Sequence, residues 1–437
     1  MARRPLPLPA WPLTIATARG SGGDKPIEIN RLRRYDCRVP DLVRKQGYMP
    51  ATAAMPGELI TSLEELRAVL TRIDATQAEE IERVASRYAF RVPRFYVENV
   101  LRNDPADPLW PLAIPGQVEL QDAGEERWDA FQLPRRVVDH PRWIQKYRYE
   151  ALLRVTDFCS GLCRYCYLKN RDVAPGCISH GEIDEIFDAA EQSPQRGELR
   201  ELILSGGDPL AAPGAIIGHF AERIDRLNRT VPRRITVCIH TRDPVWYPGR
   251  ILQSAALREA LRRLAPSSYI LHVVHPREVT PQLHAALQLL SELGGARRPL
   301  MLTQHPLFRG VNADAAIITD LYDRLDSGPV VVKPYYLIHP FPDGTLPQHR
   351  LTLRESQRIL RELAAAPGTR VPLLTVPTPM GKCVIGPYDP LPDEGGYHLL
   401  HTKDGVPVRY STGRVYNPHE SRLSIPLAPT INGVEFG

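Results

Sequence analysis

The chain of 437 residues is longer than an average domain, but its length suits a single α/β barrel with additions at both ends. Hydrophobic residues at 43% and charged residues at 24% are ordinary values for a globular protein and argue against a disordered chain. The sequence contains neither a run of about 20 apolar residues nor an apolar signal segment, so we expect a cytoplasmic protein without a membrane partner. The net charge of +5 is small and spread along the chain, so nucleic acid is not an expected partner.

The first third of the sequence predicts an arm, then helices, then a long connection. Residues 1–30 are rich in Pro, Gly and basic side chains without periodicity, which is typical of a mobile arm. Two capping boxes predict helix starts: Ser62 with Glu65, and Thr76 with Glu79. Prolines then multiply between residues 93 and 141, as expected for a connection that wraps over the surface instead of joining a sheet. We therefore predict a helical and wrapping region over residues 31–145.

From about residue 146 the sequence alternates short apolar strands with helical patterns. Six strands are predicted at residues 151–156, 202–204, 235–239, 269–274, 299–303 and 330–332. Helices are predicted to follow Ser179 with Glu182, to cover 216–227, to open at Thr280-Pro281 and, beyond the sixth strand, to follow Thr352 with Glu355. Such units form parallel strands joined by helical crossovers, so an open or closed α/β barrel over 146–350 is favoured over a doubly wound sheet, with a C-terminal region over 351–437.

Three of the seven cysteines lie within eight residues, in the segment Cys159-Ser-Gly-Leu-Cys163-Arg-Tyr-Cys166 directly after the first barrel strand. The odd number of cysteines argues against a disulfide framework, and barrel active sites are built at strand ends. A [4Fe–4S] cluster held by three cysteines leaves one iron open, and this spacing is the one that radical S-adenosylmethionine (SAM) enzymes use. Structural zinc is less favoured because no second pair of ligands follows at the usual spacing.

A glycine-rich segment, Ser205-Gly206-Gly207-Asp208-Pro209, follows the second strand and so reaches the same end of the barrel as the cysteines. Glycine allows a ligand to approach the backbone closely. Alone, the segment is a common turn. One strand after a cluster loop, it is similar to the segment that holds the amino group of SAM, so Ser205, Gly206, Gly207 and Asp208 are predicted SAM-binding residues.

Further segments occur in one collinear order: Asp104-Pro105-Ala106-Asp107-Pro108, Ala113-Ile114-Pro115, Thr156-Asp157, Leu204–Leu210, Thr241-Arg242-Asp243-Pro244, His272–Pro276, Gln304, Arg309–Asn312 and Pro334-Tyr335-Tyr336. With the cysteine loop they resemble the lysine 2,3-aminomutase family of radical SAM enzymes over roughly residues 90–410. Members of this family use SAM and pyridoxal 5′-phosphate (PLP) to move an amino group between adjacent carbons. The resemblance implies a partial (β/α)6 TIM-type barrel, and it adds Arg242, His272 and Gln304 to the predicted SAM-binding residues.

The resemblance also implies a lysine that carries PLP in a glycine-rich loop after the last helix. The matching residue is Lys382, which follows the apolar strand at 373–376 in the loop Pro377-Thr-Pro-Met-Gly-Lys382. A lysine at such a position can hold PLP covalently, although the motif is short and an ordinary exposed lysine is the alternative interpretation. Lys146 and Tyr147 match an Arg-Tyr pair at the PLP end of the family's site.

One position near this pair departs from the family. Glu150 stands where the family has a second arginine, and a carboxylate there would repel the phosphate of PLP. Arg148 and Arg154 are the two residues from which the sequence suggests a replacement.

Other departures concern the substrate. Leu168 occupies the place of an arginine that binds the substrate carboxylate in the family. Ala313 and Phe341 occupy the places of two aspartates that select the ammonium of lysine, with Asp314 and Asp343 nearby. We therefore expect a substrate other than free lysine, with Leu168, Asp314, Phe341 and Asp343 as the predicted substrate-contacting residues.

The sequence thus predicts a radical SAM enzyme that generates a 5′-deoxyadenosyl radical, with PLP-dependent 1,2-amino migration of the 2,3-aminomutase type as the leading reaction. A PLP-independent radical SAM oxidoreductase, epimerase or lyase is the alternative, and a non-enzymatic Fe–S redox sensor is a remote one. The expected partners are a small-molecule substrate and an electron donor such as flavodoxin or ferredoxin. Homo-oligomerisation, the substrate and the pathway are left open.

Overall fold

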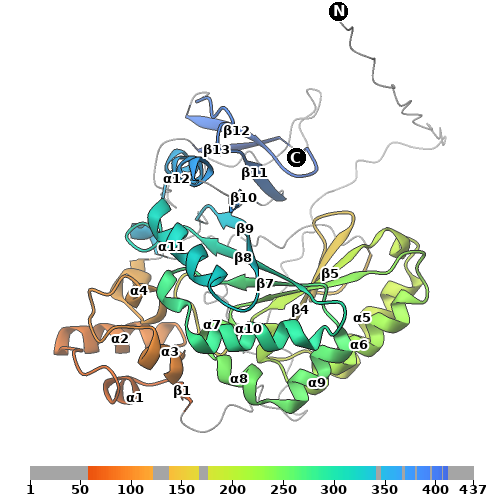
Figure 1. Cartoon of the computed structure of the whole chain (residues 1–437), viewed down its shortest axis with the longest axis horizontal. Helices are drawn as coiled ribbons and strands as arrows, with labels where there is room; N and C mark the ends of the chain where they lie inside the picture. Colours follow the sequence, from red (N-terminus) through yellow and green to blue (C-terminus); the bar gives the residue numbers. More distant parts are fainter. Residues whose placement is uncertain are drawn as a thin grey trace, which may run out of the picture. The chain divides into compact units, whose positions relative to one another are not determined.

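A computed structural model describes residues 58–121, 137–166, 176–340, 346–366, 370–378, 381–393, 396–405 and 407–411. These residues all belong to a unit that spans 48–437 and is shown in Figure 1. Several sequence predictions lie outside the described residues: the arm at 1–30 and the substrate residues Leu168, Phe341 and Asp343. The predicted domain boundaries stay predictions.

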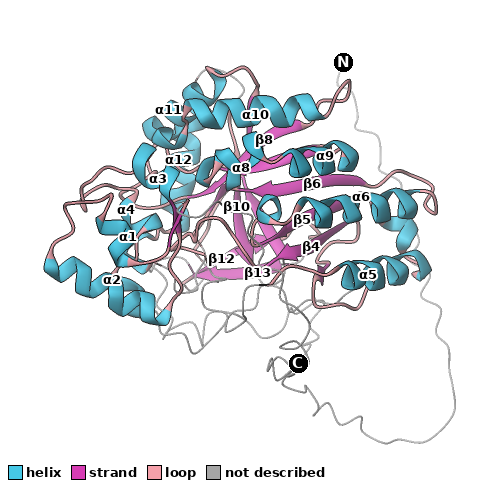
Figure 2. Cartoon of the chain, turned by 90° about the horizontal axis from the view of Figure 1, so that it is seen from below, coloured by secondary structure: helices cyan, strands magenta, loops and turns pink. Residues whose placement is uncertain are grey.

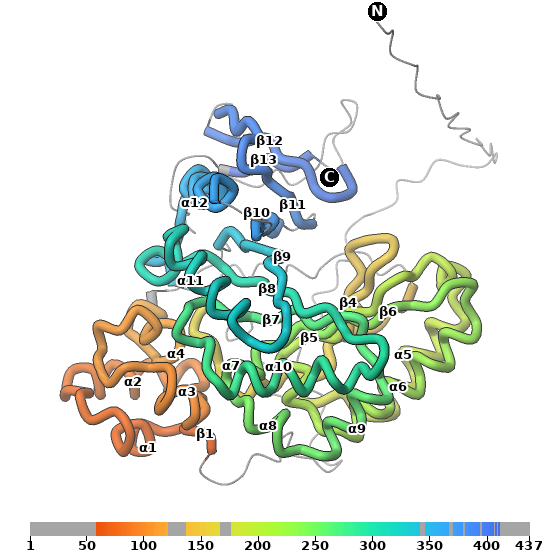
Figure 3. The backbone as a smooth tube through the Cα atoms, viewed as in Figure 1, coloured from red at the N-terminus to blue at the C-terminus, as the bar shows by residue number. Residues whose placement is uncertain are grey.

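Nine of the described strands form one sheet, in the order β11-β10-β9-β8-β7-β6-β5-β4-β3. Its seven parallel strands are β4 (Glu150–Thr156), β5 (Glu201–Gly206), β6 (Thr236–Thr241), β7 (Ser268–His272), β8 (Leu300–Pro306), β9 (Val332–Ile338) and β10 (Leu373–Thr378). The antiparallel edges are β3 (Trp143–Ile144) and β11 (Gly381–Ile385). The six predicted barrel strands correspond to β4–β9, so the partial TIM-type barrel is confirmed, and Figure 3 traces this curled sheet along the chain.

Helices connect the parallel strands: α5 (His180–Gln192), α6 (Gly214–Asn228), α7 (Asp243–Trp246), α8 (Pro248–Gln253), α9 (Ala255–Leu264), α10 (Pro281–Leu293), α11 (Ala315–Asp326) and α12 (Leu353–Ala365). Helix α9 shows why they form, because Leu257, Leu261 and Leu264 recur at helical spacing and are all buried. Figure 2 shows the helices packed along the sheet. No helix of the described residues is long and apolar enough to cross a membrane.

The predicted helix starts are confirmed at Ser62, Ser179, Thr280 and Thr352, where each side chain accepts the expected backbone hydrogen bond. The predicted cap at Thr76 is wrong. Helix α2 (Ala75–Arg87) begins two residues earlier, with a capping box formed by Asp74 and Gln77. A carboxylate accepts this bond strongly and carries a negative charge favoured at a helix N-terminus, so Asp74 takes precedence over the threonine.

The N-terminal region contains more regular structure than the proline pattern predicts. Besides α1 (Leu63–Arg67) and α2, the described residues form β1 (Leu59–Ile60), β2 (Val92–Pro93), α3 (Arg94–Asn99) and α4 (Trp110–Ala113). Residues 93–113 were expected to form an irregular connection, and this expectation is wrong in part. Pro93 and Pro111 lie at the starts of α3 and α4, where a missing N–H costs no helical hydrogen bond.

Two further expectations about strands are corrected. The sixth barrel strand, predicted at 330–332, runs from Val332 to Ile338, because Pro334 is tolerated beside a bulge in the pairing with β8. Lys382 was expected in a loop. It lies instead in β11, where it pairs with Pro377 of β10 in an antiparallel ladder.

A buried ion pair fastens the N-terminal region to the barrel. The Asp107 side chain is fully buried and pairs with Arg277, in the 3-10 turn Pro276–Glu278 after β7. Asp107 also accepts the backbone N–H groups of Arg102 at 2.6 Å and Leu109 at 2.9 Å. Burial opposes ionisation of Asp107, but Arg277 and these N–H groups outweigh it and hold the pKa of the carboxyl below its usual value.

We expect Asp107→Asn to lower the free energy of unfolding by about 3 kcal/mol at pH 7, because it leaves the Arg277 charge without its partner. The stabilisation is complete above the ordinary carboxyl pKa of about 4 and disappears as the pH falls through the lowered folded-state value. Urea unfolding measures both effects. Asp104→Asn is the control, since Asp104 is 46% exposed and lies 4.0 Å from Arg72, and it should change stability by about 0.5 kcal/mol or less. Equal effects of the two substitutions would contradict this account.

Candidate active site

The three clustered cysteines follow β4 in a short stretch of irregular backbone. The N–H of Cys166 donates to the carbonyl of Cys163 at 3.1 Å and closes a turn between these two. Burial raises the pKa of the Cys159 thiol well above its usual value, and the charges of Asp208, Cys166 and Cys163 raise it further. The three sulfur groups therefore lie close enough to influence one another.

Two buried carboxyl groups, those of Asp208 and Asp243, adjoin the cysteine loop. Burial, together with the charge of Asp208, raises the pKa of Asp243 to about 8. Arg250 is the cation that pairs with Asp243, with its Nε 3.9 Å from Oδ2. Burial opposes ionisation of the Cys159 thiol, and a bound iron cation would favour the thiolate form that ligates it. The residues present thus fit a [4Fe–4S] cluster held by Cys159, Cys163 and Cys166.

Gly161, between the first two cysteines, lies flat against the buried Trp246 of α7. A Cβ at this position would approach Trp246 Cδ2 to 2.6 Å, which is closer than any normal contact. Trp246 in turn packs on Tyr96 of α3, with 4.1 Å between ring centroids. The glycine therefore lets the loop approach the aromatic pair closely.

The N-terminal region holds the other side of the loop. Arg164 and Glu119 form an ion pair in which both side chains are 1% exposed, with Nη2 donating to Oε2 at 2.7 Å and Nε to Oε1 at 3.0 Å. Arg164 also donates to the carbonyl of Ala89 at 2.8 Å, and Arg91 Nη1 donates to the carbonyl of Cys159 at 2.8 Å. The backbone of the cysteine loop is thus fixed from outside the barrel.

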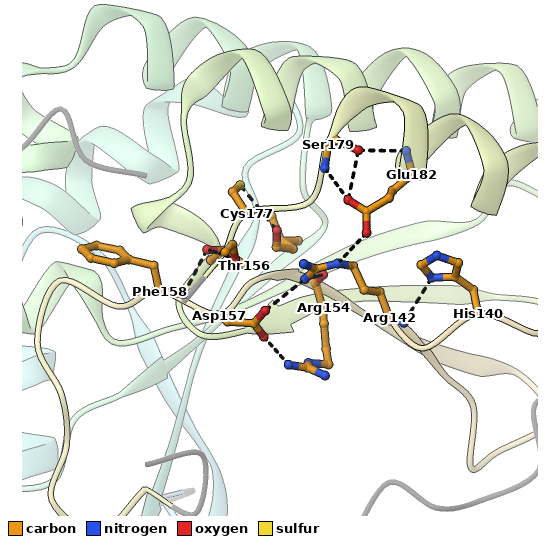
Figure 4. Close-up of polar contacts among 11 residues, drawn as sticks. His140, Arg142, Arg154, Thr156, Asp157, Phe158, Cys177, Ser179 and Glu182 are labelled. Atoms are coloured by element: carbon orange, nitrogen blue, oxygen red, sulfur yellow. Dashed lines mark hydrogen bonds and ion pairs between the residues drawn. The ribbon is translucent and has the colours of Figure 1, made fainter. Parts of the chain in front are cut away.

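A polar network fixes the exit of β4, as Figure 4 shows. Thr156 Oγ1 accepts the N–H of Phe158 at 3.1 Å, and Asp157 pairs with both Arg154 and Arg142. Arg142 Nε also lies 3.3 Å from Glu182 Oε1 at the start of α5. The Thr-Asp pair before the cysteines therefore orders the base of the loop.

The glycines after β5 pack against this same stretch of backbone. Gly206 has φ +116°, and a Cβ there would lie 2.5 Å from the carbonyl oxygen of Thr156. A Cβ on Gly207 would overlap the carbonyl of Phe158. Contact with the neighbouring backbone thus requires glycine at both positions. The sequence alone explains the same glycines by the close approach of a ligand to the backbone. Contacts of SAM with Ser205, Gly206 and Gly207 stay predictions.

Asp208 joins the strand exits of β5 and β6. Its carboxylate accepts bonds from the Thr241 hydroxyl at 2.7 Å and from the N–H groups of Arg242 at 2.7 Å, Asp243 at 2.9 Å and Leu210 at 3.0 Å. Four donors occupy this buried carboxylate, so its visible role is to order the two loops. A direct contact of Asp208 with SAM stays a prediction.

Arg242 is held rigidly at the end of β6. Its Nη2 donates to Glu278 Oε1 at 2.5 Å and its Nη1 to the carbonyl of His272 at 3.1 Å. Tyr96 donates to the same Glu278 oxygen at 2.7 Å, and the N–H of Val274 donates to Oε2 at 2.7 Å. The guanidinium is therefore paired within a buried network that includes the N-terminal region.

Gln304 links two histidines across neighbouring strands. Its amide nitrogen lies 2.5 Å from His272 Nε2 and 3.2 Å from His240 Nδ1. Burial lowers the pKa of His272 to about 3 and that of His240 well below its usual value, so both rings are neutral. His240 was not predicted. Its position two residues before Arg242, on the side of β6 opposite Ile239, is the signal that alternation along a strand offers.

Lys382 lies at the far edge of this face, beside Tyr147. Its backbone N–H donates to the Tyr147 hydroxyl at 2.7 Å, so two predicted PLP residues meet. Burial lowers the pKa of Lys382 to about 8, the cations of Lys403 and Lys146 lower it further, and Glu150 opposes them. The amine of Lys382 lies 4.5 Å from the centre of the Tyr336 ring, and Tyr336 is opposite Gln304 in the pairing of β8 with β9.

The candidate phosphate end contains a cation that the sequence did not indicate. Lys403 follows β12 (Tyr397–His401), and its Nζ lies 5.4 Å from the centre of the Tyr147 ring. The two arginines suggested as replacements for the family's second arginine are engaged elsewhere. Arg148 pairs with Glu198 at 2.6 Å, and Arg154 pairs with Asp157.

Two adjacent tyrosines form the wall beside Lys382. The pairing of β8 with β9 moves from Thr303 opposite Pro334 to Gln304 opposite Tyr336, which leaves Tyr335 as a bulge. Their rings therefore stack at 3.8 Å between centroids, and Tyr335 donates to the Tyr336 hydroxyl at 2.9 Å. The Lys382 amine lies 4.5 Å from the centre of the Tyr336 ring.

The one predicted substrate residue that the structure describes lies on a helix start. Asp314 is exposed and accepts the N–H of Ala316 at 2.7 Å as the cap of α11. No contact recorded for it in the described residues involves the other predicted site residues. Its capping role accounts for the aspartate without a substrate.

We expect alanine at Cys159, Cys163 or Cys166 to abolish the roughly four irons per chain that anaerobic reconstitution should give. Cys177→Ala and Cys238→Ala are matched controls that remove thiols of the same barrel. Iron and sulfide analysis, with the absorbance of the cluster, measures the outcome. Loss of iron in either control would show that the ligands are misassigned.

We further expect Lys382 to titrate with a pKa of about 8, well below that of an ordinary lysine. Lys403→Met should raise this pKa because it removes a neighbouring cation, and Glu150→Gln should lower it because it removes an anion. Reductive methylation with ¹³C-formaldehyde followed by NMR titration reports the values directly. Shifts in the opposite directions would contradict the described charge arrangement.

The chain is similar to known proteins. Residues 153–314 match the Radical SAM superfamily. The L-lysine 2,3-aminomutase of Escherichia coli (strain K12) is 30% identical over 310 residues, which are 70% of this chain and 85% of that protein. Those of Clostridium subterminale and of Buchnera aphidicola subsp. Baizongia pistaciae (strain Bp) are 27% identical over 365 residues and 29% identical over 278 residues. These cover 82% and 64% of this chain, and 83% and 77% of the relatives.

The matches confirm the resemblance seen in the sequence. The protein is an enzyme, an aminomutase-like isomerase, and its family implies a [4Fe–4S] cluster, SAM, a small-molecule substrate and a reductant. The match to the Radical SAM superfamily includes all three clustered cysteines. The chain belongs to the lysine 2,3-aminomutase family of radical SAM enzymes, as a divergent member.

Proposed function

We propose that the enzyme uses PLP, carried by Lys382, to move an amino group between adjacent carbons of an amino acid or amine other than free L-lysine. The observation that supports this most is the position of the Lys382 amine, 4.5 Å from the centre of the ring of Tyr336, which is opposite Gln304 in the pairing of β8 with β9. A PLP-bearing lysine and the proposed SAM-binding residues would then share one face of the sheet.

When bound, the cluster with SAM supplies the 5′-deoxyadenosyl radical that removes a hydrogen atom from the substrate, and PLP supplies a conjugated system that delocalises an unpaired electron. The protein's own residues bind and orient these groups. Cys159, Cys163 and Cys166 hold the iron, while Gln304 and the neutral His272 offer hydrogen bonds to SAM. Flavodoxin or ferredoxin is the proposed electron donor.

The protonation state of Lys382 suits its proposed role. A pKa of about 8 leaves an appreciable fraction of the amine neutral at pH 7 to 8, and only the neutral amine is nucleophilic. The Tyr147 hydroxyl accepts the backbone N–H of Lys382 and so fixes the start of β11. Gly381 has φ +132° and packs on this hydroxyl, and a Cβ there would lie 3.3 Å from it.

The paired arginine and the neutral histidines of this face favour the exclusion of water from a radical reaction. The Arg242 guanidinium is paired with Glu278, and both histidines are neutral. Hydrogen-bond donors are thereby offered without mobile charges that would draw in water. Neutral imidazoles also avoid repelling the positively charged sulfonium of SAM.

Three positions support a substrate other than lysine. Leu168, Ala313 and Phe341 replace an arginine and two aspartates of the family. Asp314, next to Ala313, is committed to capping α11. A substrate ammonium or carboxylate that loses its charged partner costs several kcal/mol, which corresponds to about a thousandfold loss of turnover.

One observation favours a second candidate, a radical reaction without PLP. Glu150 stands near the amine of Lys382, at the end of the site that the PLP phosphate would occupy. A carboxylate there disfavours a phosphate unless a cation offsets it. An oxidoreductase, epimerase or lyase reaction needs only the cluster and SAM.

The test uses the cluster-reconstituted enzyme with SAM, PLP and dithionite. Borohydride should fix one PLP per chain on Lys382, and Lys333→Ala, which removes another lysine, should retain the label. Formation of 5′-deoxyadenosine by an enzyme that carries no PLP would support the second candidate instead.

In the same assay, free L-lysine should give β-lysine about a thousandfold more slowly than the best amino acid substrate. Restoring both aspartates, with Ala313→Asp and Phe341→Asp together, should increase the formation of β-lysine measured by mass spectrometry. Robust β-lysine formation by the unaltered enzyme would refute the proposed substrate class.

A further inference from the structure

We propose that Lys403 binds the phosphate group of PLP and so replaces the arginine whose position Glu150 occupies. This inference rests on the proposed function. It assigns a role to a residue in the turn after β12, in a part of the chain for which the sequence indicated no chemistry.

The backbone of Lys403 is attached to the strand that carries Lys382. Its N–H donates to the carbonyl of Lys382 at 3.0 Å, and the preceding Thr402 forms a β-bridge with Cys383. The turn after β12 is thus anchored beside the candidate PLP lysine. Any side chain at position 403 starts from a fixed point next to Lys382.

The side chains of Lys403 and Lys382 both lie beside the ring of Tyr336. The two amines lie 5.5 Å and 4.5 Å from the centre of the Tyr336 ring. Two like charges beside one ring repel each other, and the charge of Lys403 is the largest electrostatic contribution to the lowered pKa of Lys382 after burial. In the described residues no carboxylate forms an ion pair with either amine. An anion bound between them would remove this repulsion.

The location of Lys403 identifies the phosphate as that anion. Its Nζ lies 5.4 Å from the centre of the Tyr147 ring, and Tyr147 belongs to the pair proposed to bind the PLP end. Arg148 and Arg154 are paired with Glu198 and Asp157, so neither is available there.

Lys403 also offsets the acids of this region. Burial raises the pKa of Glu201, Glu150 raises it further, and Lys403 lowers it. The pairing of β4 with β5 places these two glutamates opposite each other. A cation at position 403 therefore lies where it can reduce the repulsion that Glu150 and Glu201 would exert on a phosphate.

The experiment compares PLP with pyridoxal, which has the same aldehyde but no phosphate. Equilibrium dialysis of the cluster-reconstituted enzyme against each compound gives both dissociation constants. Lys403→Met should weaken PLP binding by about tenfold to a hundredfold, the usual worth of a charge-assisted contact, and leave pyridoxal binding within about twofold. Lys403→Arg should retain PLP affinity. Arg361→Met removes an exposed cation of α12 that stacks on Tyr388, and it should change neither constant.

A second variant tests the replacement itself. Glu150→Arg, introduced into Lys403→Met, should restore PLP affinity to within a fewfold of the unaltered enzyme. Equal weakening of PLP and pyridoxal in Lys403→Met, or failure of Glu150→Arg to restore PLP binding, would overturn the inference and leave the proposed function standing. If the unaltered enzyme binds neither compound, both the proposed function and this inference are overturned.

Discussion

The buried pair of Arg164 and Glu119 is the constraint on which the proposed cluster site depends. Arg164 lies between the second and third cluster cysteines, in a loop with little regular hydrogen bonding of its own. Breaking a fully buried ion pair leaves an unpaired charge in a medium that solvates it poorly, at a cost of about 3 to 5 kcal/mol. The loop therefore has one favourable position, against the N-terminal region. The proposed cluster site and the packing of the N-terminal region on the barrel therefore depend on the same ion pair.

The charges of the site are distributed in an order that serves radical chemistry. Arg242 with Glu278 and Arg164 with Glu119 are neutralised in buried pairs near the cysteines. The middle of the face carries neutral hydrogen-bonding groups on β6, β7 and β8. The far edge carries lysines that lack ion-pair partners among the described residues, namely Lys382 and Lys403. Two cations outside ion pairs thus lie where an anionic cofactor is proposed to bind, together with the acids Glu150 and Glu201 that they offset.

Features formed by residues adjacent in the sequence could be predicted from it, whereas features that depend on the register between strands could not. The cysteine spacing, the strands β4–β8 and the capping boxes at Ser62, Ser179 and Thr352 are patterns of adjacent residues, and the structure has each of them at or within a few residues of its expected place. The stacked Tyr335 depends on a shift of register against β8, which no pattern within β9 reveals. The glycines at 206 and 207 were found, but their reason, contact with the backbone of Thr156 and Phe158, requires the fold.

The relation between Glu150 and Lys403 shows why the phosphate end could not be settled from sequence. Around Glu150 the chain offers Arg148 and Arg154, and proximity in sequence made them the natural replacements for a lost arginine. Their own ion pairs exclude them, because Arg148 pairs with Glu198 and Arg154 pairs with Asp157. The cation proposed to replace the lost arginine, Lys403, is more than 250 residues away in the chain and is held beside Lys382 by the bridge between Thr402 and Cys383. If Lys403 binds the phosphate as proposed, a charge lost from one segment is replaced by a residue from a segment distant in the sequence.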